Sequence, residues 1–292
     1  MSATTWLPVA LALAAAAFFG CAGVVSKRGM VRVEPQLGAT ISLGSSLVVF
    51  LASSPLWMRA EDWFGLGFWI FLVNGFFHPM LSMYCWLEAI QRAGATVAST
   101  LTATAPLFAA LSSIVALGES MTALIALGTA FTVIGVVTLS WGPMRVGTAM
   151  RAALLFATGA ALVRGLNHTI GKVGLELMPN AFMAAFVSCA VSFVGMLTIY
   201  RVRQGHFPRG IPRAGLGYFL LNGALMAGGI SSMYAAISVG SVVVVSPLIA
   251  TYPVFTMVLA FALGMERLTA RLLAGVALVV GGVAAISIGM AR

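Results

Sequence analysis

The sequence FLVNG at residues 71–75 returns as FLLNG at residues 219–223. A second pair of motifs follows in the same order, ALGE at residues 116–119 and ALGME at residues 262–266. Motifs that recur in the same order along two halves of a chain indicate an internal duplication. The fold is therefore expected to consist of two equivalent halves.

The composition places this duplicated chain in a lipid bilayer. Of its 292 residues, 61% are hydrophobic and only 8% are charged, too few charges for a chain dissolved in water. In lipid, spanning segments must be helices or a closed barrel, because the backbone has to satisfy its own hydrogen bonds. The apolar runs are long and do not alternate with polar residues, which favours helices. The net charge of +9 comes from basic residues scattered between the runs, a pattern that indicates topology control and no nucleic-acid partner.

Ten apolar runs approach the length of about 20 residues that a membrane span needs. They lie at residues 6–26, 37–57, 64–87, 94–117, 121–141, 149–170, 180–200, 214–237, 240–264 and 269–289. Five belong to a first repeat, residues 1–143, and five to a second repeat, residues 144–292. With an odd number of spans each, the repeats must cross the membrane in opposite directions. The prediction is an all-α membrane protein with ten transmembrane helices in two inverted five-helix repeats, an architecture typical of secondary transporters.

The distribution of Lys and Arg predicts the orientation of these spans. The odd-numbered connections hold Lys27, Arg28, Arg32, Arg92, Arg145, Arg151, Arg201, Arg203, Arg209, Arg213, Arg267 and Arg271. The other side holds Arg59, Arg164, Lys172 and Arg292. Because basic connections stay in the cytoplasm, we expect the odd-numbered connections there and both termini outside.

The repeated motifs resemble those of the EamA family of the drug/metabolite transporter superfamily. The residues that carry the resemblance are Phe19-Gly20 with Lys27, Pro106 with residues 117–119, Gly128, Ile134-Gly135, Pro253 with Glu266, Gly275, and Gly281-Gly282. The resemblance covers nearly the whole chain. It implies a ten-helix transporter of small metabolites, often amino acids or related compounds, that are commonly exported. Many members keep their termini in the cytoplasm, whereas the charge pattern of this chain predicts the opposite orientation.

The sixth span carries the sharpest set of candidate site residues. Arg164, His168 and Lys172 fall at i, i+4 and i+8, on one helix face, and Asn167 lies beside them. Polar groups at membrane depth are costly, so they mark candidate sites. Facing a wet cavity, this stripe would attract a carboxylate or a phosphate. The alternative is that Arg164 and Lys172 extend toward the two membrane surfaces while His168 packs in the interior.

The third and eighth spans carry polar residues at matching positions. Asn74 in the third span corresponds to Asn222 in the eighth, and an interhelical hydrogen bond between the halves is the favoured interpretation of this pair. His78 lies four residues after Asn74 and is followed by Pro79, which bends a helix. Met226 stands opposite His78 in the repeat. An asymmetric polar residue on a symmetric scaffold is the better candidate for substrate contact.

Three tyrosines complete the predicted substrate-binding set of His78, Tyr84, Arg164, Asn167, His168, Tyr234 and Tyr252. Each tyrosine combines a large apolar ring with a polar hydroxyl. Tyr252 precedes Pro253 in mid-span and is the strongest of the three, whereas Tyr84 also fits an interfacial aromatic belt.

A second set is assigned gating or structural roles. It consists of Lys27, Asn74, Glu119, Lys172, Asn222 and Glu266. Glu119 and Glu266 occupy matching positions before the last span of each half, where a carboxylate at a helix N-terminus is electrostatically favourable.

The sequence argues against an enzyme. Asp62 is the only aspartate, and the chain contains no His-Glu-x-x-His motif, nucleotide-binding loop or cluster of metal ligands, so no cofactor or metal is expected. The leading hypothesis is a secondary transporter that moves a small anionic or zwitterionic, amino-acid-like metabolite by alternating access, with export as the expected direction. The alternatives are an exporter of lipophilic or lipid-linked compounds and a non-transporting membrane scaffold. The expected partners are a small-molecule substrate and the lipid bilayer of a bacterial inner membrane, for a multi-pass monomer or homodimer.

Overall fold

The computed structural model describes residues 3–93, 95–140, 150–208, 213–265 and 269–290. The first repeat contains α1 (Ala3–Met30), α2 (Pro35–Ser53), α3 (Leu66–Gly75), the π-helical turn η3 (Phe76–Leu81), α4 (Ser82–Ala93), α5 (Ala95–Thr102), α6 (Ala105–Leu117) and α7 (Ala123–Ser140). The short turns η1 (Ser54–Leu56) and η2 (Ala60–Asp62) join α2 to α3. The second repeat contains α8 (Met150–Leu177), α9 (Ala181–Gln204), α10 (Arg213–Val239), α11 (Val242–Ile249), α12 (Tyr252–Ala262) and α13 (Ala270–Met290). Within the described ranges every regular element is helical.

The helices form the ten spans that the sequence predicts. Nine helical segments in the described part of the chain are long and apolar enough to cross a membrane. The tenth span, α8, is 28 residues long and is less apolar because it carries Arg151, Arg164, Lys172 and Glu176. It packs against α3, α4, α5 and α6, so much of its surface faces protein. The protein is therefore an all-α membrane protein, as predicted, although α8 runs beyond the predicted end at residue 170 to Leu177.

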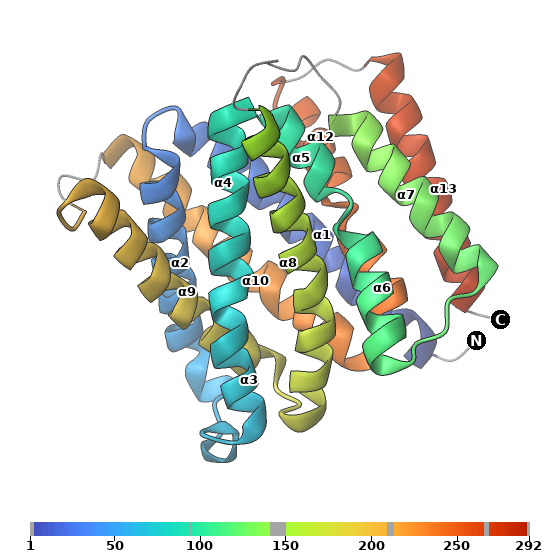
Figure 1. The fold of residues 1–292 in the computed structure, drawn as a ribbon, viewed down its shortest axis with the longest axis horizontal. Coiled ribbons are helices and arrows are strands. Elements are labelled where there is room, and N and C mark those ends of the chain that lie inside the picture. Colours follow the sequence, from blue (N-terminus) through green and yellow to red (C-terminus); the bar gives the residue numbers. More distant parts are fainter. Residues whose placement is uncertain (1–2, 94, 141–149, 209–212, 266–268, 291–292) are drawn as a thin grey trace.

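The two repeats pack through reciprocal contacts. In the first repeat α1 packs on α10 and α12, and in the second repeat α8 packs on α3, α4 and α6. Equivalent helices of the two repeats also contact each other: α2 contacts α9, and α7 contacts α13. Figure 1 shows α7 and α13 side by side at one edge of the molecule, and α1 begins at the end of the molecule where α13 finishes. The predicted boundary between residues 143 and 144 lies outside the described residues.

Close contacts between helices of the two repeats occur at matching positions. A Cβ atom added at Gly20 of α1 would lie 2.8 Å from the carbonyl oxygen of Tyr252, and one added at Gly165 of α8 would lie 2.7 Å from that of Ala105. Tyr252 and Ala105 are the first residues of α12 and α6. Glycine is needed at both positions because each helix pair approaches backbone to backbone.

Serine hydrogen bonds between helices repeat in the same way. Ser46 of α2 donates to the carbonyl of Gly223 in α10 at 2.7 Å, and Ser192 of α9 donates to the carbonyl of Gly75 in α3 at 2.8 Å. Both serines are fully buried. Gly75 and Gly223 end the two copies of the pentapeptide. Both copies therefore make the same helix contact, which explains why the motif recurs.

Candidate functional site

Two spans are broken at matching points near mid-span. The break between α5 and α6 is followed by Pro106, and the break between α11 and α12 is followed by Pro253. Thr104 and Thr251 stand at these breaks and donate back to the carbonyls of Leu101 and Leu248, at 2.6 and 2.7 Å. These bonds satisfy the ends of α5 and α11. No side chain caps the N-terminus of α6 or α12 in the described structure, so both half-helices present a positive end at mid-span.

Arg164 and His168 lie on α8 where this helix crosses the start of α6. The neighbouring Gly165 sets this position, because its Cα lies against the first turn of α6. The Nε atom of Arg164 and the Nδ1 atom of His168 are buried and have no hydrogen-bond partner among the described residues. An unpartnered buried polar atom is costly, so these atoms indicate a place where a ligand or water binds.

His78 lies near these two residues. Arg164 and His168 lie close enough to His78 to act electrostatically on it. His78 adopts an extended backbone conformation (φ −140°, ψ 129°) inside η3, which separates α3 from α4. Its Nδ1 atom lies 2.8 Å from the Ser82 hydroxyl. The structure thus brings three of the predicted substrate-binding residues together.

Asn167 and Tyr234, also predicted to bind substrate, belong to a buried hydrogen-bond network. Asn74 Nδ2 donates to Asn167 Oδ1 at 2.6 Å and lies 3.1 Å from the Tyr234 hydroxyl. That hydroxyl donates to Asn167 Oδ1 at 3.2 Å and lies 3.5 Å from Ser188 Oγ. All four side chains are fully buried. The network links α3, α8, α9 and α10, and its Asn167 directly precedes His168 in α8.

Asn222 makes the corresponding contact in the other half. Its Nδ2 atom donates to the backbone carbonyl of Ala22 in α1 at 2.8 Å. Ala22 follows Gly20 by the interval that separates Asn167 from Gly165, so Asn74 and Asn222 contact equivalent points of α8 and α1. Both asparagines form interhelical hydrogen bonds, which is the interpretation that the sequence favours.

Lys172 and Glu119 bind the connection between α10 and α11. The Lys172 ammonium donates to the carbonyls of Ile237, Ser238 and Gly240 at 3.0, 3.2 and 3.1 Å. The Glu119 carboxylate accepts the backbone N–H groups of Val242 and Val243 at 2.8 and 2.9 Å. The cation lies at a helix C-terminus and the anion at a helix N-terminus, where each is favoured by the helix dipole.

Tyr84 lies in an ionic cluster at the ends of α4 and α9 that includes residues not predicted from the sequence. Glu88 is 3% exposed and pairs with Arg92, at 2.6 Å, and with Arg203. Arg203 also donates to the Tyr84 hydroxyl at 2.8 Å. The spacing of Glu88 and Arg92 by four residues was the available signal, because such residues share a helix face. The partner in α9 depends on tertiary packing.

Three predicted residues remain. Tyr252 is half-buried at the first position of α12. Lys27 lies exposed in the last turn of α1. Glu266 lies outside the described residues.

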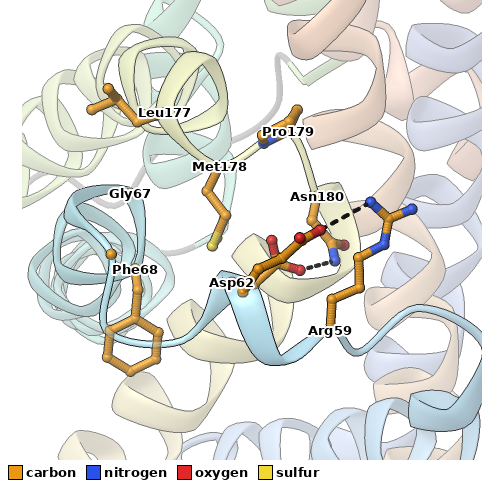
Figure 2. A pocket seen from close by; sticks show the side chains of 10 residues that line it. Arg59, Asp62, Gly67, Phe68, Leu177, Met178, Pro179 and Asn180 are labelled. Atoms are coloured by element: carbon orange, nitrogen blue, oxygen red, sulfur yellow. Dashed lines mark hydrogen bonds and ion pairs between the residues drawn. The ribbon is translucent and has the colours of Figure 1, made fainter.

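Two surface pockets are formed by other residues. The first, of about 230 Å³, lies between the α2–α3 connection and the end of α8 (Figure 2). There Asn180 Nδ2 donates to Asp62 at 2.6 Å and to the Trp57 carbonyl at 2.8 Å, while its Oδ1 atom caps α9. These bonds fasten the α2–α3 connection to α9 and give this pocket a structural role. The second pocket is an apolar groove between α3 and α9.

No group of three or more His, Cys, Asp or Glu that could hold a metal occurs among the residues described. Inverted five-helix repeats with broken helices and a polar cluster at mid-span define a membrane protein of the secondary-transporter type. The family comparison is consistent with this class. The model of the EamA-like transporter family matches twice, over residues 6–141 and 151–288, and the chain belongs to this family.

A solved crystal structure supports the fold independently. It is 16% identical in sequence and aligns with a TM-score of 0.79 over 100% of this chain and 99% of its own. At this identity the similarity shows the shared fold alone. No curated protein matches the chain.

Proposed function

We propose that the protein exports a small anionic or zwitterionic, amino-acid-like metabolite by alternating access. The observation that carries the proposal is the pair of buried nitrogen atoms without a hydrogen-bond partner, Arg164 Nε and His168 Nδ1, on one face of α8 beside His78. Among the described residues no carboxylate forms an ion pair with Arg164, which favours an anionic group on the substrate. The arginine fork matches a carboxylate with two parallel hydrogen bonds.

The half-helix ends support the same charge preference. The N-termini of α6 and α12 lie near mid-span without side-chain caps, and the start of α6 packs against α8 beside Arg164. A helix N-terminus carries about half a positive charge, which favours an anion nearby. In transporters with inverted repeats, such ends point at anionic substrate groups near the midplane.

A zwitterion also needs hydrogen-bond acceptors for its ammonium group. The hydroxyls of Ser231 in α10 and Ser246 in α11 are buried and have no partner within the described ranges. Hydroxyl oxygens accept hydrogen bonds from an ammonium. Ser246 precedes the break between α11 and α12 by about one turn.

The broken helices supply the elements that move in alternating access. Segments α4 and α5 join η3 to the α5–α6 break, so they form a unit bounded by two interruptions of helical geometry. Rocking of such units about a fixed midplane site exposes the substrate to one side at a time. We place the protein in the plasma membrane, with export as the direction.

Ligand-induced stabilisation of the purified protein tests the substrate class. Amino acids and dicarboxylates such as succinate should raise its melting temperature, while amines of the same size should not, because a ligand stabilises only the state that binds it. The shift should vanish in Arg164→Ala and return in part in Arg164→Lys, since a point charge cannot replace the bidentate fork. Arg151→Ala, at an exposed position of the same helix, is the matched control.

Transport of a stabilising ligand in proteoliposomes then tests the activity. Uptake should be lost in Arg164→Ala, whose folding is checked by the melting temperature without ligand. Unchanged transport in this variant would remove Arg164 from the site. Vesicles with the protein inserted in each orientation, separated by accessible tags, would show whether export is the faster direction.

A further inference from the structure

An apolar groove runs along the outside of the molecule between α9 and the segment formed by α3 and η3. Its volume is about 550 Å³. The residues that line it are Leu72, Phe76, Met80, Ala190, Val191, Val194, Gly195, Thr198 and Ile199. Phe76 and Val194 keep 49% and 62% of their surface exposed, so the groove opens away from the protein. In a bilayer, the medium that meets this opening is the hydrocarbon of lipid chains.

The groove exists because the third span changes its neighbours at η3. Segments α3 and η3 pack on α9, whereas α4 packs on α8 and α5. The groove thus follows α9 along α3 and η3, and it stops where the chain continues into α4. Gly195 lets η3 approach α9 closely at the floor of the groove, because the side chain of Met80 occupies the place where a Cβ atom would stand.

The groove has the length of one leaflet. At a rise of 1.5 Å per residue, the segment of α9 from Ala190 to Ile199, which carries six of the lining residues, extends over roughly 14 Å. One leaflet contributes about 15 Å of the hydrocarbon thickness. A single acyl chain that enters from one membrane surface therefore fills the groove.

The groove ends at a basic cluster. One turn beyond Met80 and Ile199, the two helices carry Tyr84 and Arg203, whose side chains hydrogen-bond at 2.8 Å. Arg203 and Arg92 share the single carboxylate of Glu88, so the cluster keeps one net positive charge. Both arginine side chains are 37% exposed, and a guanidinium has five N–H donors, so donors remain for another ligand.

We infer that this groove and its arginine cluster bind one anionic phospholipid, with an acyl chain between α3 and α9 and the phosphate at Arg203. Arginine at the end of a membrane helix lies at the depth of the lipid headgroups. Its planar fork suits phosphate oxygens, and the net positive charge favours an anionic over a zwitterionic headgroup. The bound lipid would bridge α4 and α9 at the place where long side chains of the cluster also join these two helices.

Native mass spectrometry of the purified protein tests the inference by titration with phosphatidylglycerol and phosphatidylcholine. We expect one phosphatidylglycerol to bind roughly fivefold more tightly, as one uncompensated basic charge near the headgroup region predicts. Thr198→Trp should abolish this preference by filling the groove at an exposed position. Leu155→Trp, at a 76% exposed position of α8, is the matched control and should leave it unchanged.

A second variant separates lipid binding from a purely structural role of the cluster. Glu88→Gln removes the carboxylate that Arg92 and Arg203 share, so the preference for phosphatidylglycerol should increase even if the protein becomes less stable. Equal binding of the two lipids, or a preference that survives Thr198→Trp, would overturn the inference. Glycerol 3-phosphate that competes fully with the lipid would also overturn it, because the site would then bind phosphate without a chain.

Discussion

Lys172 and Glu119 bind the two sides of one helix connection, the ammonium on the last carbonyls of α10 and the carboxylate on the first N–H groups of α11. Neither side chain pairs with an opposite charge among the described contacts; each compensates a helix end. Val242 and Val243 are buried in the protein, so their N–H groups need a protein acceptor in place of water. These two residues from distant segments therefore allow the chain to turn between the eighth and ninth spans.

Removal of either charge should destabilise this turn. We expect Lys172→Met and Glu119→Gln each to lower the free energy of unfolding by about 1.5–3 kcal/mol, the usual contribution of hydrogen bonds to charged groups. Thermal unfolding in detergent measures the change. Glu176→Gln, at an exposed position on the same helix as Lys172, should have little effect. Equal melting temperatures for all three variants would contradict a structural role of the two charges.

Substitution of Gly282 should weaken the contact between α7 and α13, whereas substitution of the neighbouring Gly281 should not. A Cβ atom at Gly282 would lie 2.6 Å from the Gly128 carbonyl oxygen, whereas one at Gly281 would meet nothing within 4 Å. Gly282→Ala should cost about 1–3 kcal/mol through overpacking. Gly281→Ala should preserve or slightly raise stability, because alanine favours helix more than glycine does. Thermal unfolding of the two variants measures the difference. A similar loss of stability in both would show that the contact between α7 and α13 is not the cause of the loss.

The tyrosine hydroxyl in the buried network can be removed with little change in shape. Tyr234→Phe should lower stability by about 1 kcal/mol, since Asn74 and Asn167 both lose a partner. Tyr218→Phe on the same helix serves as the control. If the substrate also contacts Tyr234, as the sequence predicts, the KM for transport should rise beyond what the stability change explains. An unaltered KM would restrict this residue to structure.

The orientation of the molecule in the membrane can be read with reporters. A reporter that is active only in the cytoplasm should be silent when fused after Arg292 and active when inserted in the Arg201–Arg213 connection, because basic connections remain inside. The reverse pattern would show that the distribution of Lys and Arg does not set the topology of this chain.

The candidate site could be predicted only in part. The spacing of Arg164 and His168 along one helix is visible in the sequence, and in the structure one nitrogen of each side chain is buried without a hydrogen-bond partner among the described residues. The approach of His78 to them follows from the bend at η3. Glu88 was missed because its partner Arg203 lies 115 positions away in the chain.

The sequence by itself determined the class of the protein, its ten spans and its repeat, because hydropathy and motif order are properties of the chain that do not depend on which helices meet. A long apolar segment is stable in the lipid bilayer and not in water, because of the transfer free energy of its own residues. Only the tertiary structure decided the partners of the polar groups: Asn74 with Asn167, Asn222 with the Ala22 carbonyl, Lys172 with the end of α10. Those pairings depend on the distance and register between helices, which close glycine contacts and broken spans set together.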